Sequence, residues 1–204
     1  MKAFTKQEQQ RINNAVTQAE QATSGEIVPV ILAQADDYQA STCHASALVA
    51  LAASTVAMWW HALPYWAIAL LLAATYLGTS FLLRSLPKLR RRLIATEEIT
   101  FRVDEQAMTT FVRHGLHHTR DETGILILIC LFEKRVQVLA DRGINEKVEQ
   151  KQWDDIVSTI TTGLHNDHAC DALCNAIEQC GELLTPHFPI KHDDTNELPN
   201  IIHH

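Results

Sequence analysis

The chain has 204 residues, enough for one domain of ordinary size, and carries a formal net charge of −7 at pH 7. This charge argues against a general nucleic-acid-binding protein, because such proteins display basic patches that neutralise phosphates. The five cysteines are an odd set, and segment 1–21 has no apolar core of the signal-peptide type, so we expect reduced thiols rather than disulfide bonds.

The N-terminal segment predicts a helix followed by a strand. Thr5 and Glu8 have the spacing of a capping box at the start of a helix over residues 6–22. Apolar residues then recur at helical spacing: Ile12, Ala15, Val16 and Ala19. Residues 26–33 are rich in Ile and Val and predict a strand, in which Pro29 indicates an edge position or a local irregularity.

A block without Asp, Glu, Lys or Arg extends from about Tyr38 to Leu83. It contains two apolar runs, 45–60 and 63–83, separated by a short turn, and predicts a two-helix transmembrane hairpin. Four aromatic residues gather where an interfacial belt belongs: Trp59, Trp60, Tyr65 and Trp66. Small residues are expected to let the two helices approach closely: Ala52, Ala53, Ala73, Ala74 and Gly78. The alternative is a buried helical hairpin in a soluble core.

Basic residues follow the second apolar run at once: Arg84, Lys88, Arg90, Arg91 and Arg92. This is the positive-inside pattern. Because a two-span hairpin returns the chain to its starting side, we expect an integral protein of the inner membrane with its soluble domain and both termini in the cytoplasm. The same basic cluster is a candidate for binding the anionic head groups of the lipid bilayer.

The remaining sequence predicts the second part of a soluble domain. After Pro87 a helix is expected to run to about His114 and to end at Gly115. Residues 124–132 are apolar throughout, as in a central strand, and 135–140 alternate as in a half-covered strand, so we expect an antiparallel pair. Two amphipathic helices follow, with apolar faces made by Trp153, Ile156, Val157, Ile160 and Leu164, and by Leu173, Ala176, Ile177, Cys180 and Leu184.

These elements predict an α/β fold, namely a small α/β/α sandwich with a mixed central sheet, interrupted by the two-helix transmembrane hairpin. The first part of the domain is expected at 1–41 and the hairpin at 42–84. The second part of the domain is expected at 85–190, followed by a poorly ordered polar tail at 191–204.

Short motifs occur along almost the whole chain outside the hairpin. They are residues 20–28 (Glu-Gln-Ala-Thr-Ser-Gly-Glu-Ile-Val), Gly115-Leu116 with Thr119, Gly124-Ile125-Leu126, Lys134-Arg135-Val136, Asp141-x-Gly143-Ile144, Trp153, His187-Phe188-Pro189 and Asn196-Glu197-Leu198-Pro199. Together they resemble the TPM-domain family, in a bacterial branch in which a membrane hairpin interrupts the domain.

This resemblance implies a compact α/β/α domain with a central mixed sheet. Members of the family include photosystem-repair and receptor-associated proteins, and acid phosphatase activity and divalent-metal binding are proposed for some of them. The resemblance assigns no catalytic residue by number in this chain, and we find no cofactor-binding motif in the sequence.

The best candidates for a metal site are acidic residues at strand ends. Asp36 and Asp37 follow the first predicted strand, and Asp141 follows the third. Ligands tend to bind beyond strand ends in open α/β sheets, and carboxylates there suit Ca²⁺ or Mg²⁺. If phosphoryl transfer took place at such a cation, Arg142 would assist it by pairing with the phosphate oxygens. The competing interpretation is structural, because Asp also makes turns and helix caps.

A second candidate is a soft-metal site, because two histidines and two cysteines fall close together: His165, His168, Cys170 and Cys174. The competing interpretation places Cys170 in an apolar helix face, where a free cysteine behaves as a small hydrophobic residue.

The sequence therefore predicts a membrane-anchored cytoplasmic domain that acts as an interaction or accessory module with an unidentified membrane-protein partner. One alternative is a divalent-metal-dependent phosphatase with its acidic residues at strand ends. The other is a structural metal-binding protein without turnover.

Overall fold

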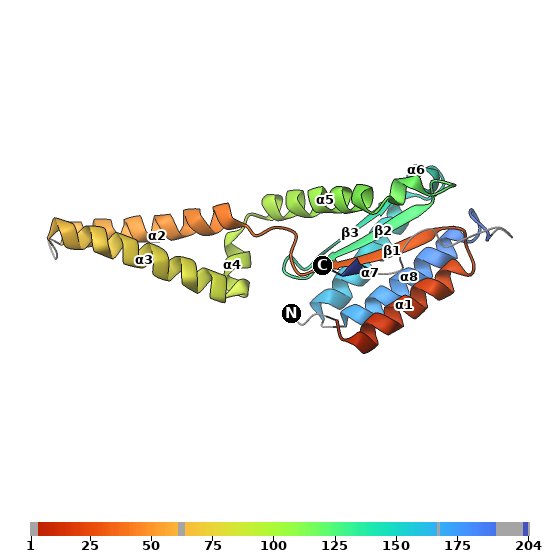
Figure 1. The fold of residues 1–204 in the computed structure, drawn as a ribbon, viewed down its shortest axis with the longest axis horizontal. Helices are drawn as coiled ribbons and strands as arrows, with labels where there is room; N and C mark the ends of the chain where they lie inside the picture. Colours follow the sequence, from red (N-terminus) through yellow and green to blue (C-terminus); the bar gives the residue numbers. More distant parts are fainter. Residues whose placement is uncertain (1–3, 61–63, 167, 191–201, 204) are drawn as a thin grey trace. The chain divides into compact units, whose positions relative to one another are not determined.

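The computed structural model describes residues 4–60, 64–166, 168–190 and 202–203. The chain forms two compact units. One contains Met1–Ala35 together with Phe101–His204, and the other contains Asp36–Thr100. The fold is mixed α/β and mostly helical (Figure 1).

The first helix, α1 (Lys6–Glu20), begins at the predicted capping box. Glu8 donates its backbone N–H to Thr5 Oγ1 (3.3 Å), and Thr5 donates its own N–H to Glu8 Oε2 (2.7 Å). Two amides of the first turn are thereby satisfied, which fixes where the helix starts. The predicted apolar stripe is buried, so α1 packs along the domain.

The sheet has the order β3-β2-β1-β4. Its body consists of β1 (Glu26–Leu32), β2 (Gly124–Cys130) and β3 (Arg135–Ala140). β1 is parallel to β2, and β3 is antiparallel to β2, as predicted for that pair. The two residues of β4 (Ile202–His203) pair in parallel with β1, so this part of the predicted polar tail extends the sheet. The other tail residues, 191–201 and 204, lie outside the described residues.

Pro29 fits within β1 because of the direction in which its missing N–H would point. Glu26 donates its N–H to Thr123 O (3.1 Å) on the β2 side. Donors alternate sides along a strand, so the N–H groups of Ile27 and position 29 face away from β2. The Ile27 N–H is accepted by Glu20 Oε1 (3.1 Å), and proline leaves no unpaired donor at its own position.

Both faces of the sheet are covered (Figure 1). Alternate residues Ile27, Ile125 and Ile127 pack in a core with α1, α7 (Gln150–His165) and α8 (Ala169–Leu184). The side chains in between them, such as Leu126 and Leu128, are also fully buried, so both faces of β2 are shielded from water. This double coverage explains why β2 is apolar at every position. The next long helix in the chain is α5 (Thr96–Arg113).

Local chemistry also fixes the turns in the unit that contains the sheet. Gly115 adopts φ 70° after α5, in the left-handed region that glycine enters without strain, and the short helix η1 (Leu116–His118) follows. Asp141 ends β3 and caps α6 (Arg142–Asn145). The helix α7 begins with a capping box formed by Glu149 and Gln152.

The second unit contains α2 (Gln39–Trp59), α3 (Tyr65–Ser85) and α4 (Pro87–Leu93). Both α2 and α3 have 21 residues and are long and apolar enough to cross a membrane. They lie side by side and pack against each other (Figure 1). The residues of the turn between them, 61–63, lie outside the described part of the chain.

The contact between α2 and α3 uses other small residues than those predicted. The buried residues of α2 recur every four positions: Thr42, Ser46, Ala50 and Ser54. The hydroxyl of Ser46 donates to Thr42 O (2.8 Å) and that of Ser54 to Ala50 O (2.9 Å), so neither needs a partner across the interface. Gly78 has open space beside its Cα, and the prediction that it permits close approach is wrong.

Candidate functional site

The predicted acidic residues follow strands that end at opposite ends of the sheet. β3 runs antiparallel to β2, so Asp141 lies where β1 and β2 begin, and it donates its N–H to Gly124 O (2.9 Å). The chain leaves β1 towards Asp36 and Asp37 at the other end of this 7-residue strand, roughly 20 Å along it. The end of β1 that precedes Asp36 and Asp37 is thus opposite to the end of the sheet beside Asp141.

Asp141 acts as a helix cap. Its Oδ1 accepts from Arg142 N (2.7 Å), and Asn145 Nδ2 donates to Ala140 O (2.7 Å) across the same turn. Arg142 pairs with Glu146 (Nε to Oε1, 3.0 Å), and this hydrogen bond raises the pKa of Arg142. The side chains of this turn thus bind one another and its backbone, which supports the structural interpretation of Asp141.

Asp36 also makes a turn. Its Oδ1 accepts from Tyr38 N (3.3 Å), and Tyr38 has φ 45° directly before α2 begins. Short hydrogen bonds from Asp to the backbone two residues later are typical of turns that precede helices. The interaction therefore positions the entry into α2.

Within the described part of the chain, no group of three or more His, Cys, Asp or Glu side chains is placed to hold a metal ion. Ca²⁺ takes 6–8 oxygen ligands, and Mg²⁺ requires near-octahedral coordination. We therefore assign no chemical step to a metal ion, and the Ca²⁺ or Mg²⁺ site at Asp36, Asp37 and Asp141 stays a prediction.

The structure instead shows a cleft of about 350 Å³ at the end of the sheet where β1 begins. We call it the sheet-edge cleft. It is lined by Ser24, Asp121, Lys147, His187, Phe188, Pro189 and Ile190. Four of these residues carry a hydroxyl, a carboxyl, an ammonium group and an imidazole, so the cleft offers hydrogen-bond donors and acceptors and charges of both signs.

The backbone around the start of β1 holds the wall of this cleft. Thr23 Oγ1 donates to Phe188 O (2.6 Å), and Ser24 N donates to the same carbonyl (2.9 Å). Thr123 Oγ1 donates to Ser24 O (3.0 Å). Thr23 and Thr123 are almost completely buried, so these bonds are shielded from water and keep the segment after α8 attached to the sheet.

Lys147 is placed over the aromatic wall of the cleft. Its Nζ lies 4.2 Å from the centroid of the Phe188 ring, a cation–π distance. His187 is next to Phe188, and its ring stands edge-on to the phenyl ring with centroids 6.5 Å apart. The exposed ammonium and imidazole groups therefore share one rim, where they could contact an anionic or polar ligand.

A second, shallower depression of about 200 Å³ adjoins the cleft through Ile190. Its other lining residues are Thr17, Glu20, Gln21, Thr23, Gly25 and Glu26. Glu20 uses one carboxylate oxygen to accept the Ile27 N–H at the edge of β1, so part of its role is structural. The depression gives this end of the sheet an acidic side next to the cleft.

Sequence reasoning did not identify these residues as a site. Glu26 and His187 occur in the sequence only as parts of the family motifs. The signal was present in those motifs, since 20–28 and 187–189 are far apart in the chain but are joined by the bridge between Thr23 and Pro189. Lys147 has no sequence signal of its own.

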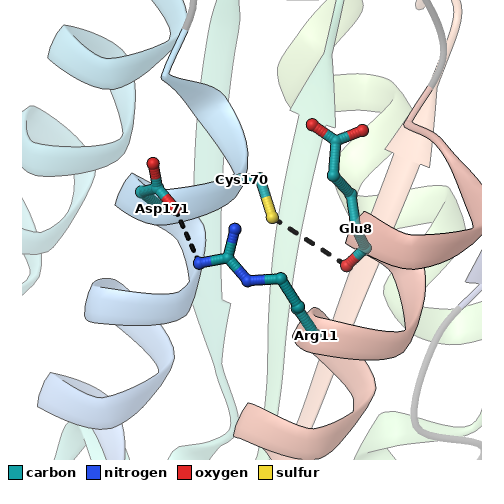
Figure 2. A network of polar contacts seen from close by, with 4 residues as sticks. All are labelled: Glu8, Arg11, Cys170 and Asp171. Carbon is teal, nitrogen blue, oxygen red and sulfur yellow. Dashed lines mark hydrogen bonds and ion pairs between the residues drawn. The ribbon is translucent and has the colours of Figure 1, made fainter.

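One of the predicted soft-metal residues, Cys170, lies at the contact between α1 and α8 (Figure 2). Arg11 reaches from α1 to Asp171 on α8 (Nη2 to Oδ1, 2.7 Å), and Cys170 points towards the backbone carbonyl of Glu8 (Sγ to O, 3.9 Å). Burial raises the pKa of Cys170 to about 11, so its thiol is protonated at neutral pH. His165, His168, Cys170 and Cys174 form no metal-binding group among the described residues.

Comparison with known proteins agrees with this fold. Residues 92–183 match the model of the family described as the TPM domain. The chain is also similar to BA42 from the psychrophilic bacterium Bizionia argentinensis, solved by NMR, with a TM-score of 0.63, 21% sequence identity, and coverage of 100% of this chain and 97% of BA42. At this identity the likeness concerns the fold alone. No curated protein matches the chain.

The soluble unit is thus a mixed α/β domain of a recognised kind. Residues 92–183 carry the TPM-domain match, which confirms the resemblance carried by the short motifs in that part of the chain.

Proposed function

We propose that this chain is a membrane-anchored TPM-domain protein whose soluble domain acts as an interaction or accessory module. The observation that carries the proposal is the outward-facing apolar surface of α2 and α3. Large apolar side chains of both helices are exposed, among them Leu48, Val56, Leu70, Leu77 and Phe81. Such a surface is unfavourable in water and suited to lipid.

The low burial of these helices argues against the alternative of a soluble core hairpin. Only 22% of the apolar window of α2 and 6% of that of α3 are buried within the protein. A core helix of a soluble protein would bury most of such a segment. The small-residue contact between α2 and α3 is also the kind of packing that joins helices in lipid.

The distribution of charge supports a cytoplasmic soluble domain. Five basic residues lie between positions 84 and 92, and the block before them contains none. Short segments rich in Lys and Arg stay on the cytoplasmic side. The proposal therefore places both termini in the cytoplasm and the turn between α2 and α3 on the other side of the inner membrane.

Topology reporters test the anchoring. An alkaline phosphatase reporter, which is active only outside the cytoplasm, should be active when inserted between α2 and α3 and inactive when fused at either terminus. A cytoplasmic fluorescent reporter should give the opposite pattern. Release of the full chain from membranes by alkaline carbonate, or an inactive reporter in the turn, would refute the proposed anchoring.

The module role rests on the sheet-edge cleft, which offers polar and charged groups to a partner. A partner that docks there would contact Lys147 and His187. We therefore expect the purified chain to show no phosphatase turnover with or without Mg²⁺ or Ca²⁺. Calorimetric titration with each cation tests the metal-binding alternative. A binding heat that the unchanged chain gives and the variant Asp141→Asn does not give would favour that alternative.

Hydrolysis of phosphate esters is the second candidate function for the same cleft. Lys147 and His187 share its rim, and an ammonium group can neutralise phosphate oxygens while an imidazole can transfer a proton. Turnover of p-nitrophenyl phosphate that is lost in His187→Gln, but kept in the exposed control His117→Gln, would replace the module by an enzyme.

A further inference from the structure

The helix α4 has a surface that the anchoring role alone does not explain. It follows α3 after a single residue, Leu86, whose φ of −118° and ψ of 79° break the helix, and it restarts at Pro87. The chain therefore changes direction directly after the second apolar helix. No residue of α4 is buried in the protein.

Three leucines at this helix form an exposed stripe. Leu86, Leu89 and Leu93 are 45%, 40% and 51% exposed. Their spacing of three and then four residues places them on one side of a helix. A helix of 7 residues is too short to be stable alone in water. α4 packs against α2 and α3, but this contact leaves about half of the surface of its leucine stripe exposed.

Basic residues occupy the rest of the helix surface. At 100° per residue, Lys88 and Arg91 project away from the leucine stripe, Arg90 and Arg92 flank it, and Arg84 precedes them in the last turn of α3. No acidic residue occurs between positions 84 and 96. The segment therefore combines an apolar face with a cationic face that has no acidic residue near it in the chain.

This combination is typical of helices that lie in the interface of a membrane. We infer that α4 is an interfacial helix whose leucines enter the acyl boundary and whose basic residues bind anionic lipid head groups. This inference rests on the proposed membrane insertion of α2 and α3, which would hold α4 at the lipid surface. A protein partner fits less well, because the stripe continues directly from a lipid-facing span.

Setting the topology of the hairpin is the competing role for the same basic residues. The two roles can be separated in nanodiscs, since both faces of the disc are accessible and orientation no longer matters. Each basic residue near an anionic surface is expected to strengthen binding about fivefold. Neutralising three of them should therefore weaken the binding of α4 to anionic lipid strongly and leave the insertion of α2 and α3 unchanged.

The test is hydrogen exchange on the full chain in nanodiscs of pure phosphatidylcholine and of phosphatidylcholine with 30% phosphatidylglycerol. The amides of α4 should exchange at least about tenfold more slowly in the anionic discs. The variant K88Q/R91Q/R92Q should lose this lipid dependence. The variant L89Q/L93Q should lose protection in both discs.

A matched control carries the same charge change elsewhere. The exposed residues Lys6, Arg113 and Lys151 of the soluble unit serve in the variant K6Q/R113Q/K151Q, which should keep the lipid dependence of α4. Equal exchange of α4 in both discs, or the same loss in the control, would overturn the inference. If the inference on α4 fails but the amides of α2 and α3 exchange slowly in every disc, the proposed anchoring still holds. Fast exchange of the amides of α2 and α3 would refute the anchoring itself.

Discussion

The contact between α7 and α8 allows a sharp test of the packing. A Cβ added at Gly163 would lie 2.2 Å from Ala172 Cβ and 3.1 Å from His168 O. Both neighbours belong to α8 or the residue before it, so the two helices meet here without room for a methyl group. Gly163→Ala should therefore force them apart.

The expected magnitude follows from two opposing terms. Overpacking of a close contact costs about 3 kcal/mol at the upper end of its usual range. Replacing glycine by alanine in a helix returns at most about 1 kcal/mol. We expect Gly163→Ala to lower the free energy of unfolding of the soluble unit by about 2 kcal/mol.

A second substitution shows whether the clash is the cause. Ala172→Gly alone should cost about 1 kcal/mol in helix propensity. In the double variant the methyl group moves from one helix to the other and the two helix-propensity effects cancel, so the free energy of unfolding should be close to that of the unchanged chain, well below the sum of the single losses. Pulse proteolysis in urea on the detergent-solubilised chain measures each value.

The control combines Gly163→Ala with Ala15→Gly, a buried alanine on α1, and these two effects should add. Additive losses for Gly163→Ala and Ala172→Gly would mean that the two positions do not touch. That result would refute the packing of α7 against α8 as described.

Three further outcomes are expected. Thr5→Ala removes the capping box and should lower the free energy of unfolding by about 1 kcal/mol in a urea titration, whereas Thr5→Ser should keep it. Ser46→Leu places a large side chain in the contact of α2 with α3 and should make the hairpin sensitive to protease, unlike Leu48→Phe at an exposed position. Burial raises the pKa of Cys130 and Cys180 to about 12, so iodoacetamide at pH 8 should label neither thiol until the chain is denatured. Because both folded pKa values lie above the ordinary value of 9.0, their contribution to stability is complete below pH 9 and is lost as pH rises towards 12. Rapid labelling of the folded chain would contradict the burial of these thiols.

Local signals in the sequence predicted most elements well, but the single helix expected after Pro87 is wrong, because the extended backbone at Ile94 divides it into α4 and α5. The capping box at Thr5 and Glu8 fixed the start of α1, and the glycine at 115 follows the end of α5 as expected. β2 was recognisable because no polar residue interrupts it, and the period-2 pattern gave β3 from Arg135 to Ala140. These features depend on neighbours in the chain, which a sequence displays directly.

The site was harder to predict because it depends on strand direction. Asp36 and Asp141 both follow strands, but β1 and β3 end at opposite edges of the sheet. The sheet-edge cleft combines Ser24, Lys147 and His187, which no local pattern connects. Only the pairing of the start of β1 with the segment after α8 brings these residues together.

The insertion of two apolar helices between neighbouring parallel strands sets an order of events during synthesis. β1 is complete at Leu32, but its partner β2 begins at Gly124, after both apolar helices. In the proposed membrane-anchored form, α1 and β1 must therefore wait without their strand partner β2 while the hairpin leaves the ribosome and meets the membrane. The domain can close only afterwards, so a chain whose hairpin fails to insert would expose an unpaired strand and become a substrate for quality-control proteases.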